Sequence, residues 1–253
     1  MIIKIYFPII IVLAILIGCQ STRKITYFND IAAANGADSL NRAMQLKVQP
    51  GDILQITITT IDKDVSLIFN PAMMGSASLA NNNIEQGYLV DSSGYIGLPV
   101  IGKIYVKDKT TPAINDEVAK ELDKTIRNAY VSTRLINFRV SVLGDVARPG
   151  SYKIASERAS ILDALSMAGD LNTSAKRNDV MVIREINGIK NYTSLDLNNS
   201  KTLSSPYYYL SNNDVIYVKP GPSRLFATSK TVQLLPAIIG VISLLTTIII
   251  LRK

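Results

Sequence analysis

The chain has 253 residues, enough for one large domain or two small ones. It contains no histidine and one cysteine, so it lacks the commonest catalytic base and can form neither an intrachain disulfide nor a cysteine-based zinc site. The net charge is +7 without a cluster of Lys and Arg, so we expect no nucleic-acid partner. These features disfavour enzymes, and we expect neither a metal nor an organic cofactor.

The first 18 residues have the organisation of a secretion signal. Lys4 supplies a positive charge, residues 5–17 form an apolar run, and the small residue Gly18 precedes the expected cleavage point. As a helix, the apolar run would extend about 20 Å, which is too short to span a bilayer. We therefore interpret residues 1–18 as a signal peptide that is removed.

The single cysteine, Cys19, directly follows this signal. The sequence "LIGC" at residues 16–19 resembles a bacterial lipobox, which implies cleavage before Cys19, a diacylglycerol on its sulfur and a fatty acyl chain such as palmitate on its amine. Several acyl chains hold a protein on a membrane far more firmly than one. Gln20 replaces the Asp that would signal inner-membrane retention, which favours the outer membrane. Residues 19–45 are interpreted as the lipidated N-terminus and a polar tether.

The sequence "VQPGDILQITITT" begins the first ordered region. Its Pro-Gly pair predicts a turn, and apolar residues then alternate with polar ones from Leu54 to Ile58, as in a half-buried strand. Residues 70–86 show no periodicity and predict a long loop. Residues 87–106 predict three strands, separated by a tight turn at Asp91–Gly94 and a bend at Pro99–Gly102.

The first helix is predicted after these strands. Thr111 can cap this helix, and Pro112 can take its first position. Apolar residues recur at helical spacing from Ile114 to Ala129, so we expect the helix to end near residues 128–130.

A second module is predicted from residue 138 onward. Alternating apolar residues and a turn at Arg148–Gly150 predict a hairpin. Ser160 then caps a helix, with Asp163 in a capping box and Gly169 as its stop. Two strands, a helix and further strands predict a small α+β roll. The further strand patterns lie at residues 179–186, 190–197 and 213–220.

The chain ends in a second apolar segment, residues 234–251, after a linker at residues 221–233. As a helix this segment would extend about 27 Å, which predicts a transmembrane helix. Small and weakly polar residues form one stripe on it, which suits helix–helix contact or the wall of a pore; a simple second anchor is the other interpretation. The stripe contains Pro236, Gly240, Ser243 and Thr247.

Two long stretches of the chain resemble a known family. Residues 46–137, with "VQPGDILQITI" and "YLVDSSGYIGLPVIGKIYV", resemble the polysaccharide export domain of Wza-type proteins. Residues 138–220, with "VLGDVARPGSYKI" and "SILDALSMAGDL", resemble the soluble-ligand-binding β-grasp (SLBB) domain that follows it. The expected fold is therefore α+β. The residues that match family motifs, as turn formers or subunit contacts, are Pro50, Gly51, Asp52, Asp91, Gly94, Leu98, Pro99, Gly102, Gly144, Pro149 and Gly150.

The resemblance implies a ring-shaped homo-oligomer in the outer membrane that exports capsular or exopolysaccharide from the periplasm. It also implies a pore lined by the C-terminal helices and a partner in the inner membrane, a polysaccharide co-polymerase that is often a tyrosine kinase. The alternative is an envelope lipoprotein that forms no pore, binds glycan or scaffolds an export complex, and could be anchored in the inner membrane.

Individual side chains have structural and functional interpretations. Asp52 could hydrogen-bond its own turn or a neighbouring subunit. Tyr207–Tyr209 could stack on sugars, although tyrosines are also ordinary strand residues. Ser92-Ser93-Gly94 is not a nucleophile elbow, so we assign no catalytic residue.

Overall fold

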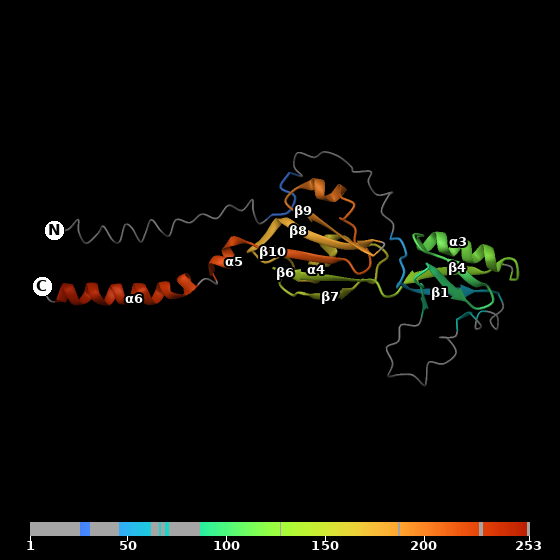
Figure 1. The fold of residues 1–253 in the computed structure, drawn as a ribbon, viewed down its shortest axis with the longest axis horizontal. Coiled ribbons are helices and arrows are strands. Elements are labelled where there is room, and N and C mark those ends of the chain that lie inside the picture. The colour runs from blue at the N-terminus through green and yellow to red at the C-terminus, as the bar shows by residue number, and fades with distance from the viewer. Residues whose placement is uncertain are drawn as a thin grey trace, which may run out of the picture.

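The computed structural model describes residues 26–30, 46–61, 66, 69–70, 87–126, 128–186, 188–227 and 230–251. The predicted signal peptide, Cys19 and most of the predicted loop at residues 70–86 lie outside the described residues. Two domains containing helices and strands are followed by a C-terminal helix (Figure 1). We call residues 46–137 the first domain and residues 138–220 the second domain. The prediction of mixed helices and sheets is confirmed.

The first domain is built on a three-stranded antiparallel sheet in the order β2-β1-β5. The central strand β1 (Ile53–Thr59) pairs with the short β2 (Tyr88–Leu89) and with β5 (Tyr130–Leu135). A hairpin of β3 (Tyr95–Leu98) and β4 (Gly102–Tyr105) lies beside this sheet. The inward residues of β1, the hairpin and the following helix form one hydrophobic core.

Helix α3 (Thr111–Leu122) is shorter than the sequence suggested. Its cap is Thr110, whose side chain accepts a hydrogen bond from the backbone N–H of Ala113, rather than Thr111. The helix buries Ile114, Val118 and Leu122 and ends there, with Asp123 as its C-cap. The chain then turns, and Asn128 has a positive φ of 59° shortly before β5. The predicted end near residues 128–130 is therefore wrong.

The second domain contains a five-stranded mixed sheet in the order β7-β6-β10-β8-β9. The middle strand β10 (Val215–Pro220) runs parallel to β6 (Arg139–Gly144) and antiparallel to β8 (Ala175–Ile186). The edge strands are β7 (Gly150–Lys153) and β9 (Ile189–Leu195). The strands predicted from the sequence are thus all present in this domain.

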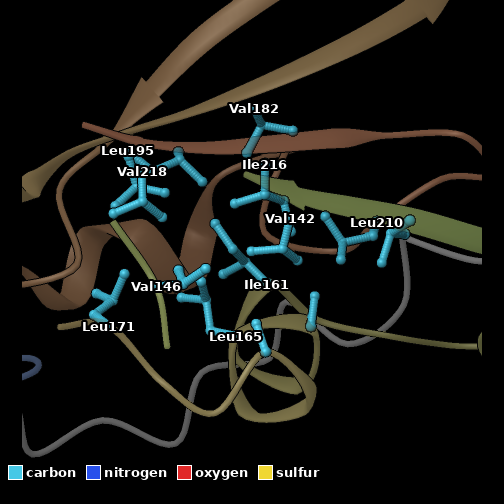
Figure 2. Packing of buried hydrophobic residues seen from close by; sticks show 14 of the residues in the cluster. Val142, Val146, Ile161, Leu165, Leu171, Val182, Leu195, Leu210, Ile216 and Val218 are labelled. Atoms are coloured by element: carbon cyan, nitrogen blue, oxygen red, sulfur yellow. The ribbon is translucent and has the colours of Figure 1, made fainter. Parts of the chain in front are cut away.

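Helix α4 (Ile161–Met167) packs its apolar side against this sheet. Figure 2 shows Ile161 and Leu165 of the helix pointing toward the sheet residues Val142 and Ile216. The predicted capping box is confirmed: Ser160 accepts from the Asp163 backbone N–H, and the Asp163 carboxylate accepts from the Ser160 backbone N–H at 2.7 Å.

The remaining helices are η5 (Ser200–Ser204), which precedes β10, and α5 (Pro222–Ala227) and α6 (Lys230–Leu251), which follow it. Within the described part of the chain, none of the helices combines the length and apolar character needed to cross a membrane. The prediction of a transmembrane helix over residues 234–251 is therefore not upheld. The segment is helical, with Pro236 inside the helix.

Candidate functional site

The two domains enclose a cleft of about 1000 Å³. The first domain contributes the turn that precedes β1, and the second contributes the start of β6 and the segment before β10. Polar and charged side chains from both domains therefore face one space. Those used below are Gln49, Asp52, Arg139, Arg184, Tyr209 and Asn212.

Asp52 joins the two domains at the base of this cleft. Its Oδ2 accepts a hydrogen bond from the backbone N–H of Gln49 at 2.9 Å, and its Oδ1 accepts one from Asn212 Nδ2 at 2.7 Å. The residue is only 2% exposed, and this burial raises the pKa of its carboxyl, against the opposing effect of the two hydrogen bonds. Asp52 thus closes its own turn, as one interpretation predicted, and its second partner lies in the other domain of the same chain.

Asn137 makes a second polar connection where the chain passes from one domain to the next. Its Oδ1 accepts from the backbone N–H of Ile53 at 2.8 Å, and its Nδ2 donates to the Gly51 carbonyl at 3.1 Å. Sequence reasoning missed this residue, although an Asn between two strand patterns was a usable signal. Together Asp52 and Asn137 fix the turn of the predicted motif.

Arg184 lines the cleft on the side of the second domain. Its guanidinium hydrogen-bonds Asp214 through Nε and Nη2, with Nη2–Oδ2 at 2.7 Å, and Nη2 also donates to the Tyr209 carbonyl at 2.7 Å. The Asp214 side chain is 1% exposed, so this is a buried ion pair that anchors the segment before β10. The pair was not identified from the sequence, because its two residues lie 30 positions apart.

The tyrosine run at residues 207–209 is held by arginines. The Arg158 guanidinium lies 3.9 Å from the ring centroid of Tyr209, and that of Arg184 lies 4.9 Å from the ring centroid of Tyr207. The Arg158 guanidinium therefore covers one face of the Tyr209 ring, and the Arg184 guanidinium covers one face of the Tyr207 ring. Tyr209 lines the cleft, whereas Tyr207 and Tyr208 do not.

The remaining charges in the cleft are of both signs. Lys47, Lys107 and Arg139 face it together with Asp108 and Glu185. Such a mixed lining suits hydrogen bonding to a polar ligand or protein surface better than strong attraction of one sign of charge. Among the described residues, no group of His, Cys, Asp or Glu side chains is arranged to hold a metal ion.

The other motif residues of the first domain shape its hairpin. Asp91 begins the turn and accepts at Oδ1 from the backbone N–H groups of Ser93 and Tyr95, both at 2.9 Å. Gly94 follows in the same turn, and Leu98 at the end of β3 is buried in the core. Pro99 and Gly102 lie at the bend into β4. None of these five residues lines the cleft, whereas Pro50 does.

Gly144, Pro149 and Gly150 lie in the second domain, away from the cleft. Gly144 ends β6 with φ of 95°, and a Cβ there would lie closer than 3.0 Å to the Val218 carbonyl, a contact that real Cβ atoms essentially never make. Pro149 and Gly150 belong to the connection into β7. On α6, all four residues of the predicted stripe are exposed, and the Thr247 hydroxyl donates to the Ser243 carbonyl at 2.9 Å.

Asp145, directly after Gly144, is a buried carboxylate that sequence reasoning did not identify. It is 0% exposed and accepts hydrogen bonds from Ser174 Oγ at 2.6 Å, from Asn172 Nδ2 at 2.8 Å and from Arg224 of helix α5. Burial acts to raise the pKa of Asp145, but these donors and the Arg224 charge outweigh it and hold the pKa below its usual range. Asp145 therefore attaches the C-terminal helices to the second domain.

Comparisons with known proteins agree with this architecture. Residues 41–136 match the polysaccharide biosynthesis/export protein family, and residues 138–218 match the SLBB domain family. The EPS I polysaccharide export outer membrane protein EpsA of Ralstonia nicotianae is 26% identical over 207 residues, covering 77% of this chain and 52% of the relative. The EpsA protein of Ralstonia solanacearum is 26% identical over 205 residues, covering 77% and 53%. The chain thus spans about half the length of the curated relatives that it matches. With both domains matched in the order predicted from its motifs, the chain belongs to the Wza-type polysaccharide export family.

Proposed function

We propose that this protein is a lipid-anchored subunit of an oligomeric outer-membrane channel that exports capsular or exopolysaccharide from the periplasm. The observation that carries the proposal is the succession of a polysaccharide export domain and an SLBB domain, shared with relatives named as polysaccharide export outer membrane proteins. In this role the protein is passive, and an inner-membrane polysaccharide co-polymerase or tyrosine kinase is its proposed partner.

The joint between the domains supports a ring-forming subunit. A closed ring repeats one interface around an axis, so each subunit must present its surfaces at a constant relative orientation. The Asp52–Asn212 hydrogen bond crosses between the domains and restricts that orientation, while the Asn137 contacts hold the turn that carries Asp52. Of the motif residues of the β3–β4 hairpin, Pro99 and Gly102 are exposed outside the cleft and are available as subunit contacts.

Helix α6 supports association between copies. Its apolar side chains Leu234, Ile239 and Leu244 are each about 60% exposed in the single chain, a state that is unfavourable in water. We propose that α6 helices pack against one another in the ring, with Pro236, Gly240, Ser243 and Thr247 as the contact or pore-lining stripe.

The proposal is tested by purifying the mature protein in mild detergent and imaging it. Closed rings with a central cavity support the channel, and a strain that lacks the gene should retain polysaccharide in the cell. Monomers that nevertheless bind glycan would overturn the channel proposal.

Substitution Cys19→Ala should abolish acylation and outer-membrane sorting, and unchanged sorting would reject the lipid anchor.

The cleft supports a second candidate function, an envelope lipoprotein that binds glycan or scaffolds an export complex without forming a pore. Its volume of about 1000 Å³ and its mixed polar lining with Tyr209 suit a polar ligand. The imaging experiment separates this candidate from the channel, because only the channel requires rings.

A further inference from the structure

A short segment near the N-terminus contacts the second domain. The backbone N–H of Phe28 donates to the Leu197 carbonyl at 3.0 Å, and that of Asn29 donates to the Asn198 carbonyl at 2.7 Å. Figure 1 shows this segment beside the second domain, on the same side as η5. Residues 26–30, which we call the strap, thus run along the segment that follows β9, within the stretch that the sequence assigned to a free tether.

Asp30 fixes one end of the strap. Its Oδ1 accepts from the Ser200 backbone N–H, and its Oδ2 accepts from the Ser200 hydroxyl, both at 2.7 Å. These two bonds hold the pKa of Asp30 below its usual range. The carboxylate therefore accepts from the first N–H of η5, while the Asn199 side chain accepts from the next, that of Lys201.

Tyr27 fixes the other end of the strap. Its ring is partly buried against the hydrophobic core of the second domain, and its hydroxyl donates to the Asp170 carboxylate. The Arg177 guanidinium lies 5.8 Å from the ring centroid. Burial first, and the neighbouring Asp170 second, raise the pKa of Tyr27 well above its usual value, so the hydroxyl stays protonated as a donor.

The site that holds Tyr27 continues into the site that holds helix α5. Asp170 Oδ1 also accepts from the Leu171 backbone N–H at 2.6 Å, and the next residue, Asn172, donates to Asp145 Oδ1 at 2.8 Å. Asp145 in turn binds Arg224 of α5. The strap and the C-terminal helices are therefore supported by adjacent residues of one loop, 170–174.

We propose that the surface formed by Asp170, Arg177, Leu197, Asn198 and Ser200 is a docking site for residues 26–30 of the same chain, and that the docked strap sets the distance between the second domain and the acylated Cys19. Thr26 follows Cys19 by seven positions, so the free connection can reach at most about 25 Å. A free tether up to residue 45 would allow several times that reach. The distance-setting role rests on the lipidation proposed above, and the docking itself does not.

Docking is tested by hydrogen exchange on the full mature chain in detergent. Peptides that contain Phe28 and Asn29 should exchange at least about tenfold more slowly in the native protein than in a Tyr27→Ala/Asp30→Ala variant. Ser200→Ala should have an effect in the same direction, and Asp116→Ala, an exposed position on α3, should have none. Unprotected exchange of this segment in the native protein would overturn the docking site.

The distance-setting role is tested with one flexible Gly/Ser insert of 20 residues placed at two positions. Between residues 21 and 22 the insert, whose r.m.s. end-to-end distance is about 25 Å, lengthens the connection to the lipid, and polysaccharide export should fall severalfold. Between residues 37 and 38 the same insert lies after the strap, and export should be unchanged. Equal export by both insertion variants would overturn the role, and in the Tyr27→Ala/Asp30→Ala background the difference between the positions should disappear.

Mass measurement of the mature protein separates this inference from the proposed function. A chain that lacks acyl groups at Cys19 but keeps slow exchange at Phe28 and Asn29 would remove the lipid anchor and support the docking site. An acylated chain with fast exchange at Phe28 and Asn29 would support the lipid anchor and overturn the docking site.

Discussion

Asp52 and Asp145 are both buried carboxylates at joints of the molecule, but their surroundings differ. Asp52, at the joint between the domains, accepts from one backbone N–H and one neutral amide, and its pKa is raised by burial. Asp145, at the joint with α5, has three side-chain donors including a guanidinium, and its pKa is lowered despite complete burial. Burial acts to raise the pKa at both residues, and only at Asp145 do the hydrogen-bond donors and the neighbouring Arg224 charge outweigh it.

The largest expected effect on stability comes from a change at Gly144, which directly precedes Asp145. Gly144→Ala places a Cβ against the Val218 carbonyl in a backbone conformation that favours glycine, and should lower the free energy of unfolding of the second domain by about 2–5 kcal/mol. Urea unfolding measures this loss. Gly97→Ala is the matched control, because nothing lies within 4 Å of a Cβ at that position. Equal stability of the two variants would contradict the close contact.

Asp145→Ala comes next. The change removes three hydrogen bonds and leaves the partly buried Ser174 hydroxyl without this acceptor, whereas Asn172 keeps its bond to the Val146 carbonyl, so we expect a loss of about 2–3 kcal/mol in urea unfolding. Arg224→Ala should cost less than about 1 kcal/mol, because the Arg224 side chain is 50% exposed and solvent weakens its charge interaction. A larger loss for Arg224→Ala than for Asp145→Ala would show that the joint depends on the ion pair instead.

Asp52→Ala should have a smaller effect on stability and a distinct effect on shape. We expect a loss of about 1–2 kcal/mol, together with a wider range of domain orientations measured by small-angle X-ray scattering. Asn212→Ala should reproduce the change in domain orientation without opening the turn at Gln49. If Asn212→Ala leaves the scattering curve unchanged, this hydrogen bond does not restrict the domains.

The smallest expected effect is on the pH dependence of stability, where the two carboxylates should act in opposite directions. Because the folded pKa of Asp145 lies below its unfolded value of about 3.9, its contribution is present above that pH and is lost as the pH falls through the folded value. The folded pKa of Asp52 lies above its unfolded value. The contribution of Asp52 to stability therefore weakens as the pH rises from the unfolded pKa to the folded pKa. Urea midpoints between pH 3 and 6 should therefore rise less steeply with pH in Asp145→Asn, and more steeply in Asp52→Asn, than in the native protein.

Features with local causes were predictable from the sequence. The alternation in β1, the Ser160–Asp163 capping box and the strands of the second domain depend on residues close together in the chain, and all are present. The end of α3 was missed because Ile126 and Ala129 continue the apolar repeat and pack against the core, although the helix itself ends at Leu122. The C-terminal segment was read correctly as a helix, but its apolar run was overestimated as a membrane span.

The contacts that define the candidate sites were not predictable, because they join distant residues. Asp52 and Asn212 lie 160 positions apart, and Asp30 and Ser200 lie 170 apart. No periodicity or spacing rule connects such pairs in one sequence. The motif Pro50-Gly51-Asp52 did indicate a turn, but only the folded chain shows which domain Asp52 reaches.

The strap has a consequence for the order of events during biogenesis. A chain that is translocated from its N-terminus exposes Tyr27 and Asp30 early, whereas Asp170 and Ser200 emerge only after most of the remaining chain. Under the proposed processing at Cys19, the segment beside it would therefore be free of its docking site while the N-terminus is processed. Under the proposed export, the strap can dock only after the second domain has been translocated.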